Sequence, residues 1–203
     1  QQEARRSLEE MYYQDKEWAE LIELYQNSLK TIADPVTKSK ILTSCASLAK
    51  DQLQDIGKAA FFYTEMLKIS PQDMNVLKNL EELYLKLQQW NYAIDVLGRQ
   101  ANLTPSPQEK ARILMQMAVL WSEKLNNLNE GVRHYEKALE LYEDQTILKI
   151  LEDIYSYQKE WRKLTGIYQR QCKLIQDDES LVDFYCKIGS VAKEKLNDLD
   201  MAI

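Results

Sequence analysis

Glycine, proline, cysteine and histidine are all scarce in this chain of 203 residues, which contains five, four, three and one of them. With so few glycines and prolines, long stretches rich in Leu, Glu, Lys, Gln and Ala run on without interruption, and these residues favour helix. No apolar run approaches the roughly 18 residues that a membrane-spanning helix needs. We therefore expect an all-α protein with no membrane span.

The residue types that carry most protein chemistry are also sparse. Cys45, Cys172 and Cys186 form no metal-binding spacing, and an odd cysteine count favours a reducing compartment over a disulfide framework. His134 has no second ligand one helical turn away, so no metal site is expected. Gly-rich phosphate loops and hydrolase motifs do not occur. We predict a non-enzymatic, cytoplasmic protein with no catalytic residue, cofactor or metal.

Acidic residues outnumber basic ones, with 32 Asp and Glu against 26 Lys and Arg and a formal net charge of −6. Binding to nucleic acid requires clustered cations that neutralise phosphates. We therefore expect no nucleic-acid partner. Hydrophobic residues make up 45% of the chain, which is enough for a continuous buried core.

An internal repeat organises the chain. The segment LEEMYYQDKEW (residues 8–18) returns as LEELYLKLQQW (80–90) and as LEDIYSYQKEW (151–161), at spacings of 72 and 71 residues. Between these copies, KDQLQDIGKAAFFYTEML (50–67) aligns with SEKLNNLNEGVRHYEKAL (122–139) and KEKLNDLDMAI (193–203). Repeated units stack on their neighbours, which favours function on an extended surface over a closed pocket. Because the last copy stops one turn into a helix and Gln1 is not an initiator Met, we expect the chain to be a piece of a longer array.

Each unit contains two pairs of helices. Leu77, Leu80 and Tyr84 lie on one helical face, and Trp90, Ala93 and Leu97 resume the pattern after two polar residues. A break this short makes the two helices antiparallel. The pattern resembles the tetratricopeptide repeat, a helix–turn–helix of about 34 residues. The companion pair matches at Leu114, Met117, Ala118, Trp121, Gly131, Tyr135 and Ala138, with one extra residue in its loop before Leu128.

The resemblance implies a right-handed superhelical solenoid of antiparallel helix pairs as one domain over residues 1–203. We expect about five and a half pairs, at approximately 1–34, 36–71, 73–105, 107–143, 145–177 and an incomplete 178–203. Trp18, Trp90 and Trp161 open second helices at positions that the family buries, so we expect core roles for them. Some sites that the family fills with small residues hold polar ones instead: Glu9, Glu81, Glu152, Gln100 and Gln171.

In the family, the first helices of the pairs line a concave groove that binds partners. Carried onto this chain, the groove positions give these partner-binding residues: Arg6, Glu10, Tyr13, Lys50, Lys78, Glu82, Leu85, Met115, Val119, Lys149, Asp153 and Lys193. At these positions the first, third and fifth pairs, which we call odd pairs, carry a base and an acid four residues apart. The second, fourth and sixth pairs, which we call even pairs, are neutral or apolar. One interpretation is a mixed-charge groove for an extended or helical partner segment. The other is a set of i,i+4 ion pairs on a solvated face.

We predict a protein–protein interaction scaffold that binds a protein or peptide segment along this groove. One alternative is that the array is the substrate-recognition arm of a larger enzyme. A second alternative is a structural array that self-associates through the open ends of the solenoid, because terminal repeats need polar caps for solubility.

Overall fold

The structure, a computed structural model, describes residues 2–196 and residue 198. Eleven α-helices and three short π-helical segments, η1 to η3, build this part of the chain, and it contains no strand. The bounds are α1 Gln2–Gln14, α2 Trp18–Leu29, α3 Pro35–Ser47, η1 Leu48–Gln52, α4 Ile56–Ile69, α5 Met74–Lys86, α6 Trp90–Leu103, α7 Pro107–Val119, η2 Leu120–Lys124, α8 Leu128–Leu141, α9 Gln145–Gln158, α10 Trp161–Cys172, α11 Asp178–Val191 and η3 Ala192–Leu196.

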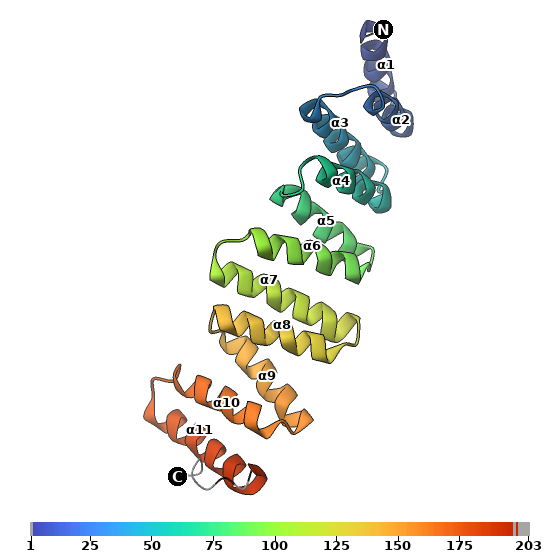
Figure 1. The fold of residues 1–203 in the computed structure, drawn as a ribbon. Coiled ribbons are helices and arrows are strands. Elements are labelled where there is room, and N and C mark those ends of the chain that lie inside the picture. Colours follow the sequence, from blue (N-terminus) through green and yellow to red (C-terminus); the bar gives the residue numbers. More distant parts are fainter. Residues whose placement is uncertain (1, 197, 199–203) are drawn as a thin grey trace. The chain divides into compact units, whose positions relative to one another are not determined.

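The chain divides into two compact units, residues 1–104 and residues 105–203. In unit 1 the helices pair as α1/α2, α3/α4 and α5/α6, and in unit 2 as α7/α8 and α9/α10, followed by α11 (Figure 1). Within each unit every helix packs against the next one along the chain. This arrangement confirms the all-α fold of stacked antiparallel helix pairs.

A side-chain cap begins each of the five described helices that follow a loop between pairs. The carboxylates of Asp34, Asp73, Asp144 and Asp177 accept hydrogen bonds from backbone N–H groups in the first turns of α3, α5, α9 and α11. The hydroxyl of Ser106 does the same for α7. Each cap satisfies donors that have no partner within the helix and stabilises the helix by about 1 kcal/mol. The pair boundaries are therefore fixed locally by the sequence.

The turn inside each pair contains one non-glycine residue in the left-handed conformation. These residues are Lys16, Gln54, Gln88, Asn126 and Lys159, with φ between 51° and 60°. In odd pairs the turn closes with a single i→i+5 bond, such as that from the Gln89 N–H to the Tyr84 carbonyl at 2.9 Å. A left-handed residue at this point is the usual way to end a helix, although glycine normally fills it.

Even pairs end their first helix differently. The α-helix passes into a π-helical turn, η1, η2 or η3, and after η1 and η2 the chain reverses into α4 and α8. In η2 the Leu125 N–H donates to the Leu120 carbonyl at 3.1 Å, and the Asn127 N–H donates to the Trp121 carbonyl at 2.8 Å. The extra residue that we expected in the loop before Leu128 is therefore absorbed inside the last turn of the first helix. A π-turn accommodates one more residue while the backbone hydrogen bonds are kept.

Each unit has its own hydrophobic core. Small residues allow the helices of a pair to approach closely, as at Ala59, Ala93, Ala118 and Ala138, which are all fully buried. The helices α7/η2 and α8 also approach closely at Gly131, where an added Cβ would lie 1.9 Å from the Ser122 Oγ and 3.1 Å from the Ala118 carbonyl oxygen. Only glycine fits this position without a shift of its neighbours.

The polar residues at small-residue sites pair with each other. The Gln100 Nε2 donates to the Glu81 Oε2 at 2.8 Å, and the Gln171 Nε2 donates to the Glu152 Oε2 at 2.9 Å. Each bond joins the first and second helices of one odd pair. In the first odd pair, Glu9 instead forms a salt bridge with Arg5 on its own helix at 2.8 Å. In the third and fifth pairs, the two polar residues that replace small ones therefore bind each other across the pair.

Candidate protein-binding surface

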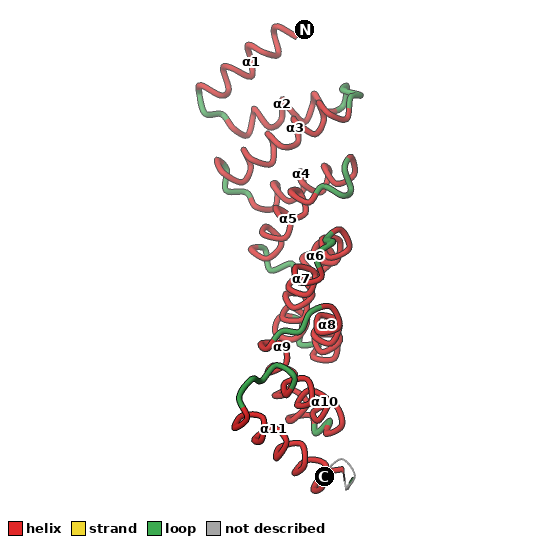
Figure 2. Tube along the Cα trace, turned by 90° about the vertical axis from the view of Figure 1, so that its left-hand side faces the viewer, coloured by secondary structure: helices red, strands yellow, loops and turns green. Residues whose placement is uncertain are grey.

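Two kinds of contact define two faces in each unit. On one face, first helices meet: the Lys50 Nζ of η1 lies 3.0 Å from the Glu82 Oε2 of α5, and the Lys187 Nζ of α11 lies 4.0 Å from the Glu152 Oε1 of α9. We call this the first-helix face, formed by α1, α3 and α5 in unit 1 and by α7, α9 and α11 in unit 2. In unit 2, Figure 2 shows α9 and α11 on the left and α8 and α10 on the right.

On the other face, second helices meet each other or the loops of neighbouring pairs. The Arg99 Nη2 of α6 donates to the Pro71 carbonyl at 2.9 Å. In unit 2, the Lys163 Nζ of α10 lies 3.2 Å from the Glu136 Oε1 of α8. These bonds span neighbouring pairs, so they stabilise the stacking within each unit.

In unit 1 most of the predicted groove residues are accessible. Arg6, Glu10 and Tyr13 lie exposed on α1, and Lys78 lies exposed on α5. Tyr13 keeps 64% of its surface in contact with solvent although its ring meets the Trp18 ring edge-on, with 5.3 Å between ring centroids. An aromatic side chain this exposed is typical of a contact surface.

Lys50, Glu82 and Leu85 complete the predicted set in unit 1. Lys50 is half-buried in η1, Glu82 is exposed on α5, and Leu85 is half-buried on α5. The Glu82 carboxylate binds the Lys86 ammonium at 2.6 Å as well as that of Lys50. Hydrogen bonds from Lys86 and then from Lys50 hold the pKa of Glu82 below its usual value, and the bond to Glu82 raises the pKa of Lys50. These two groove residues are therefore already engaged with each other.

The three expected i,i+4 ion pairs do not form in the part of the chain that the structure describes. Glu82 contacts Lys50 and Lys86 rather than Lys78. Lys149 and Asp153 form no salt bridge, and Arg6 and Glu10 form none either, whereas their neighbours Arg5 and Glu9 do. The base-first order does not account for this difference, because Arg5 and Glu9 pair in the same order and at the same spacing. The interpretation of these residues as internal pairs is wrong.

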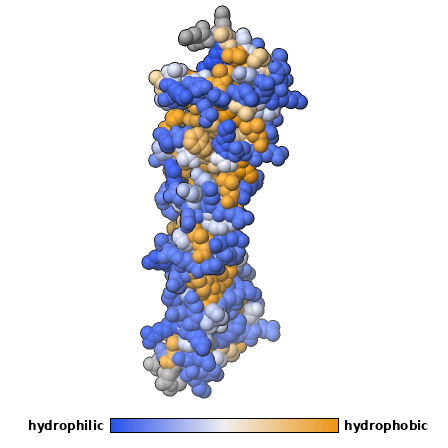
Figure 3. Space-filling view, turned by 90° about the vertical axis from the view of Figure 1, so that its right-hand side faces the viewer, coloured by the Kyte–Doolittle hydropathy of each residue, from blue (hydrophilic) through white to orange (hydrophobic). Residues whose placement is uncertain are grey.

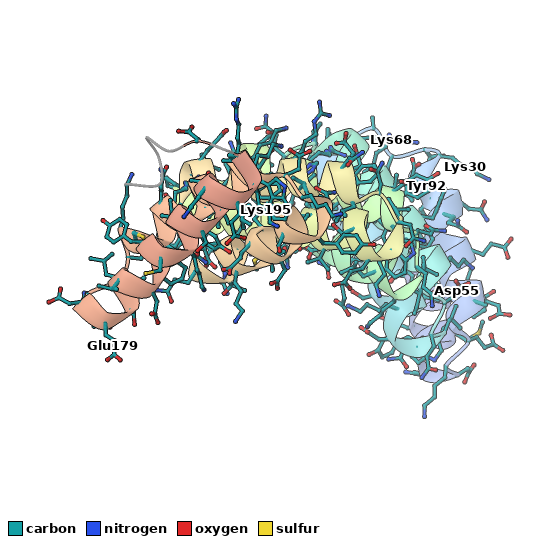
Figure 4. All side chains as sticks on the ribbon, turned by 90° about the horizontal axis from the view of Figure 1, so that it is seen from below. Lys30, Asp55, Lys68, Tyr92, Glu179 and Lys195 are labelled. Atoms are coloured by element: carbon teal, nitrogen blue, oxygen red, sulfur yellow. The ribbon has the colours of Figure 1, made fainter. Side chains whose placement is uncertain are left out.

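In unit 2 the first-helix face carries Met115 and Val119, which are half-buried on α7, and Lys149 and Asp153, which are exposed on α9. Lys193 is exposed in η3. Figure 4 labels Glu179, near the start of α11, and Lys195, in the η3 segment that follows the helix. The first-helix face of unit 2 thus presents half-buried apolar groups on α7 and exposed charged groups on α9 and η3.

A cavity of about 470 Å³ opens beside Met115, between α7 and the start of α9. Arg112, one turn before Met115, forms part of its wall, and Tyr142 and Ile147 form the opposite side. The sequence reasoning missed Arg112 and Tyr142. For Arg112 the spacing of three residues from Met115 was an available signal, whereas Tyr142 lies in the linking segment, where helical periodicity gives no guidance.

The tryptophans, Cys45 and His134 could suggest ligand stacking, nucleophilic catalysis or metal binding, but each packs within the helix pairs. Trp18, Trp90 and Trp161 are half-buried rather than fully buried, because each sits at the first position of its helix, at the edge of the pair. Burial raises the pKa of the Cys45 thiol to about 12, so the thiol stays protonated at neutral pH. The His134 ring packs on Trp121, and its Nδ1 lies 2.8 Å from the Glu130 carbonyl oxygen.

Neither a metal cluster nor a membrane span occurs in the described part of the chain. Among residues 2–196 and 198, no group of three or more His, Cys, Asp or Glu side chains could hold a metal ion. No helix in the same residues is long and apolar enough to cross a membrane.

Comparison with known sequences identifies two of the helix pairs. The sequence profile of the tetratricopeptide repeat family matches residues 4–38 and 76–111. The chain contains tetratricopeptide repeats. Both matches begin with an odd pair, α1/α2 or α5/α6, and extend into the following first helix. No curated protein sequence matches the chain.

Among solved structures, these repeats are similar to the N-terminal domain of stress-induced protein-1 (STI-1) from C. elegans, with a TM-score of 0.47, 13% identity and coverage of 60% of this chain and 98% of that one. A MamA protein gives a TM-score of 0.47 and 18% identity, covering 81% of this chain and 86% of that one. PilF of Pseudomonas aeruginosa gives a TM-score of 0.46 and 17% identity, covering 98% of this chain and 86% of that one.

Proposed function

We propose that this tetratricopeptide-repeat chain is a non-catalytic interaction scaffold that binds segments of a protein partner on the first-helix faces of its two units. The observation that supports this most directly is the charge left unused there. Lys78, Lys149 and Asp153 are exposed and form no salt bridge with any described residue. Such charges contribute little to the stability of the fold and remain available to a partner.

Apolar positions on the first-helix faces also support binding of a protein partner. Protein interfaces place apolar and aromatic groups at the centre and charges around them. Met115 with its cavity of about 470 Å³ provides such a centre in unit 2, and the exposed Tyr13 ring provides one in unit 1. A cavity of this size lies in the range of specific binding pockets and can accept large side chains of a bound segment.

Charge reversal on the first-helix face tests the proposal. We would compare the wild-type chain with a Lys78→Glu, Lys149→Glu variant in quantitative affinity capture from native lysate. The captured protein would then be purified and titrated by calorimetry. We expect the variant to bind at least about tenfold more weakly, because the reversed charges repel the acidic groups that the lysines attract. Its unfolding free energy should change by less than about 0.5 kcal/mol.

Lys137→Glu is the matched control, because Lys137 is exposed on the second helix α8. Arg99 is unsuitable, since its bond to the Pro71 carbonyl links neighbouring pairs. If Lys137→Glu weakened binding while the Lys78→Glu, Lys149→Glu variant bound normally, the binding surface would lie on the second helices and the assignment of the first-helix face would be wrong.

A further inference from the structure

A second pocket lies in unit 1, away from the predicted groove residues. It has a volume of about 380 Å³ and opens between the ends of α2 and α4 and the first half of α3. Two of its three walls are second helices, and none of the predicted groove residues lines it. We call it the α2/α4 pocket. The α2/α4 pocket is therefore a candidate binding site separate from the first-helix face.

The interior of the α2/α4 pocket is apolar. Phe62 and Leu42 are buried and form its floor, and Leu29 and Ile69 are half-buried at its sides. Phe61 borders it with 52% of its surface exposed, and its ring meets the Phe62 ring edge-on, with 5.5 Å between ring centroids. An exposed phenylalanine beside an apolar hollow marks a contact site more often than a neutral stretch of surface. Apolar atoms reach the surface of unit 1 among hydrophilic ones in the upper part of Figure 3.

The rim of the pocket is basic. Lys30, Lys38 and Lys68 line it together with a single acid, Glu65. The Lys68 ammonium pairs with Glu65, with 2.5 Å between Nζ and Oε1, and the Lys30 ammonium donates to the neutral amide oxygen of Asn27 at 2.9 Å. Lys38 forms no salt bridge within the described residues. The rim therefore keeps a net charge of about two positive units in a chain whose formal net charge is −6.

The charges face one side of the unit. Figure 4 shows Lys30 and Lys68 at the upper right, on the opposite side of unit 1 from Asp55. A positive rim around an apolar hollow attracts carboxylates and at the same time offers a dry site for a large side chain. Both features complement a ligand that carries carboxylates beside one large apolar side chain.

We propose that the α2/α4 pocket binds an acidic segment of a partner protein, which inserts one bulky apolar side chain between α2 and α4 while its flanking carboxylates pair with Lys30, Lys38 and Lys68. A volume of about 380 Å³ is at the small end of specific binding pockets. This limits the anchor to one large side chain with its immediate neighbours. The site is independent of the first-helix face and gives the scaffold a second point of attachment.

Selection from a random peptide library tests this proposal and does not require the partner to be identified. Twelve-residue peptides displayed on phage would be selected against the intact chain, and selected peptides would be synthesised with a fluorescent label for titration by polarisation. We expect Asp and Glu to be enriched on both sides of one Phe, Trp or Leu. Replacing that residue of the peptide by Ala should weaken binding at least about tenfold, as loss of an interface anchor does.

Protein variants locate the site. Lys38→Glu with Lys68→Glu should weaken binding of the selected peptide at least about tenfold, and Phe61→Ser should weaken it about fivefold. Lys40→Glu is the matched control, because Lys40 is exposed on the same helix as Lys38 but lies outside the pocket. Circular dichroism and urea midpoints should show all variants folded.

Several outcomes would overturn the proposal. One is selection of no peptide, or of peptides without acidic enrichment. Another is a selected peptide that binds the Lys38→Glu, Lys68→Glu variant normally but loses affinity with Lys149→Glu in unit 2, which would place the peptide on the first-helix face. Binding to vesicles containing one third phosphatidylserine that is abolished by the Lys38→Glu, Lys68→Glu change, with no peptide selected, would replace the protein segment by a lipid surface.

Discussion

Removal of the buried bond between Glu81 and Gln100 should reveal a strong energetic coupling between the two helices of one pair. Gln100 is only 3% exposed, and its Nε2 lies 2.8 Å from the Glu81 carboxylate. A hydrogen bond to a charged group contributes about 1.5–3 kcal/mol to stability. If Glu81 is replaced by Ala, the amide of Gln100 loses its acceptor and cannot reach water.

We therefore expect Glu81→Ala to reduce the free energy of unfolding by about 2–3 kcal/mol. Gln100→Ala should cost about 1–2 kcal/mol, because the half-buried Glu81 can turn its carboxylate toward solvent. The double variant restores two small residues, the usual occupants of these sites in the repeat family. Its cost should fall short of the sum of the single costs by about 1–2 kcal/mol.

Urea unfolding of the four proteins, followed by circular dichroism at 222 nm, measures this coupling. Costs that add to within about 0.5 kcal/mol would refute the reasoning, because they would show that the bond contributes no interaction energy. The equivalent pair in unit 2, Glu152 with Gln171, serves as a comparison. There the Gln171 Oε1 is buried without a hydrogen-bond partner and Lys187 lies 4.0 Å from Glu152, so we expect a smaller coupling.

Further predictions concern backbone fit and titration. Gly131→Ala should destabilise unit 2 by about 1–3 kcal/mol in urea melts, because its Cβ would lie 1.9 Å from the Ser122 Oγ, and Gly131→Ala with Ser122→Ala should recover part of the loss. Lys159→Gly should stabilise by about 0.5–1 kcal/mol, because glycine adopts φ of 60° without strain, whereas Lys149→Gly in mid-helix should destabilise by a similar amount. Burial raises the pKa of Cys45 to about 12, and it also raises the pKa values of Tyr63 and Tyr135. The free energy of unfolding should therefore be level between about pH 6 and about pH 8 and fall above about pH 9, where these groups ionise in the unfolded chain but stay protonated in the folded one. A constant urea midpoint from about pH 7 to about pH 10.5 would contradict this. If the two units form one continuous solenoid, small-angle scattering should give a radius of gyration above the roughly 17 Å of a compact chain of this length.

The sequence predicted the helices and their pairing well, because both depend on local signals. Apolar spacing and a short polar break are visible within about ten residues of the boundaries, and a capping Asp or Ser precedes each helix that follows a loop between pairs. The alignment also indicated the extra residue in even pairs, but placed it in the loop before Leu128. The structure places it in η2, because a π-turn preserves backbone hydrogen bonds that a longer loop would lose.

The contacts of charged side chains could be predicted only in part. Gln100 and Glu81 were noticed separately as departures from the pattern, and their equal spacing of 19 residues in two copies was a signal that they face each other. The choice of Lys50 over Lys78 by Glu82 was not accessible, because it depends on how one pair stacks on the next. The α2/α4 pocket was missed for the same reason, since its walls come from three helices.

Odd and even pairs differ in how the first helix ends and in how the two helices contact each other. The structural repeat is therefore two successive pairs rather than one. An odd pair ends its first helix at a single left-handed residue, and two of the three such pairs hold their helices together with a buried Glu–Gln bond. An even pair ends its first helix in a π-turn and brings its helices together at small residues such as Ala118 and Gly131. The predicted groove residues follow the same alternation: Lys78 and Lys149 lie on odd first helices, whereas Met115 lies on an even one. A partner segment bound to the first-helix face of unit 2 should therefore carry apolar groups where it meets α7 and charged groups where it meets α9.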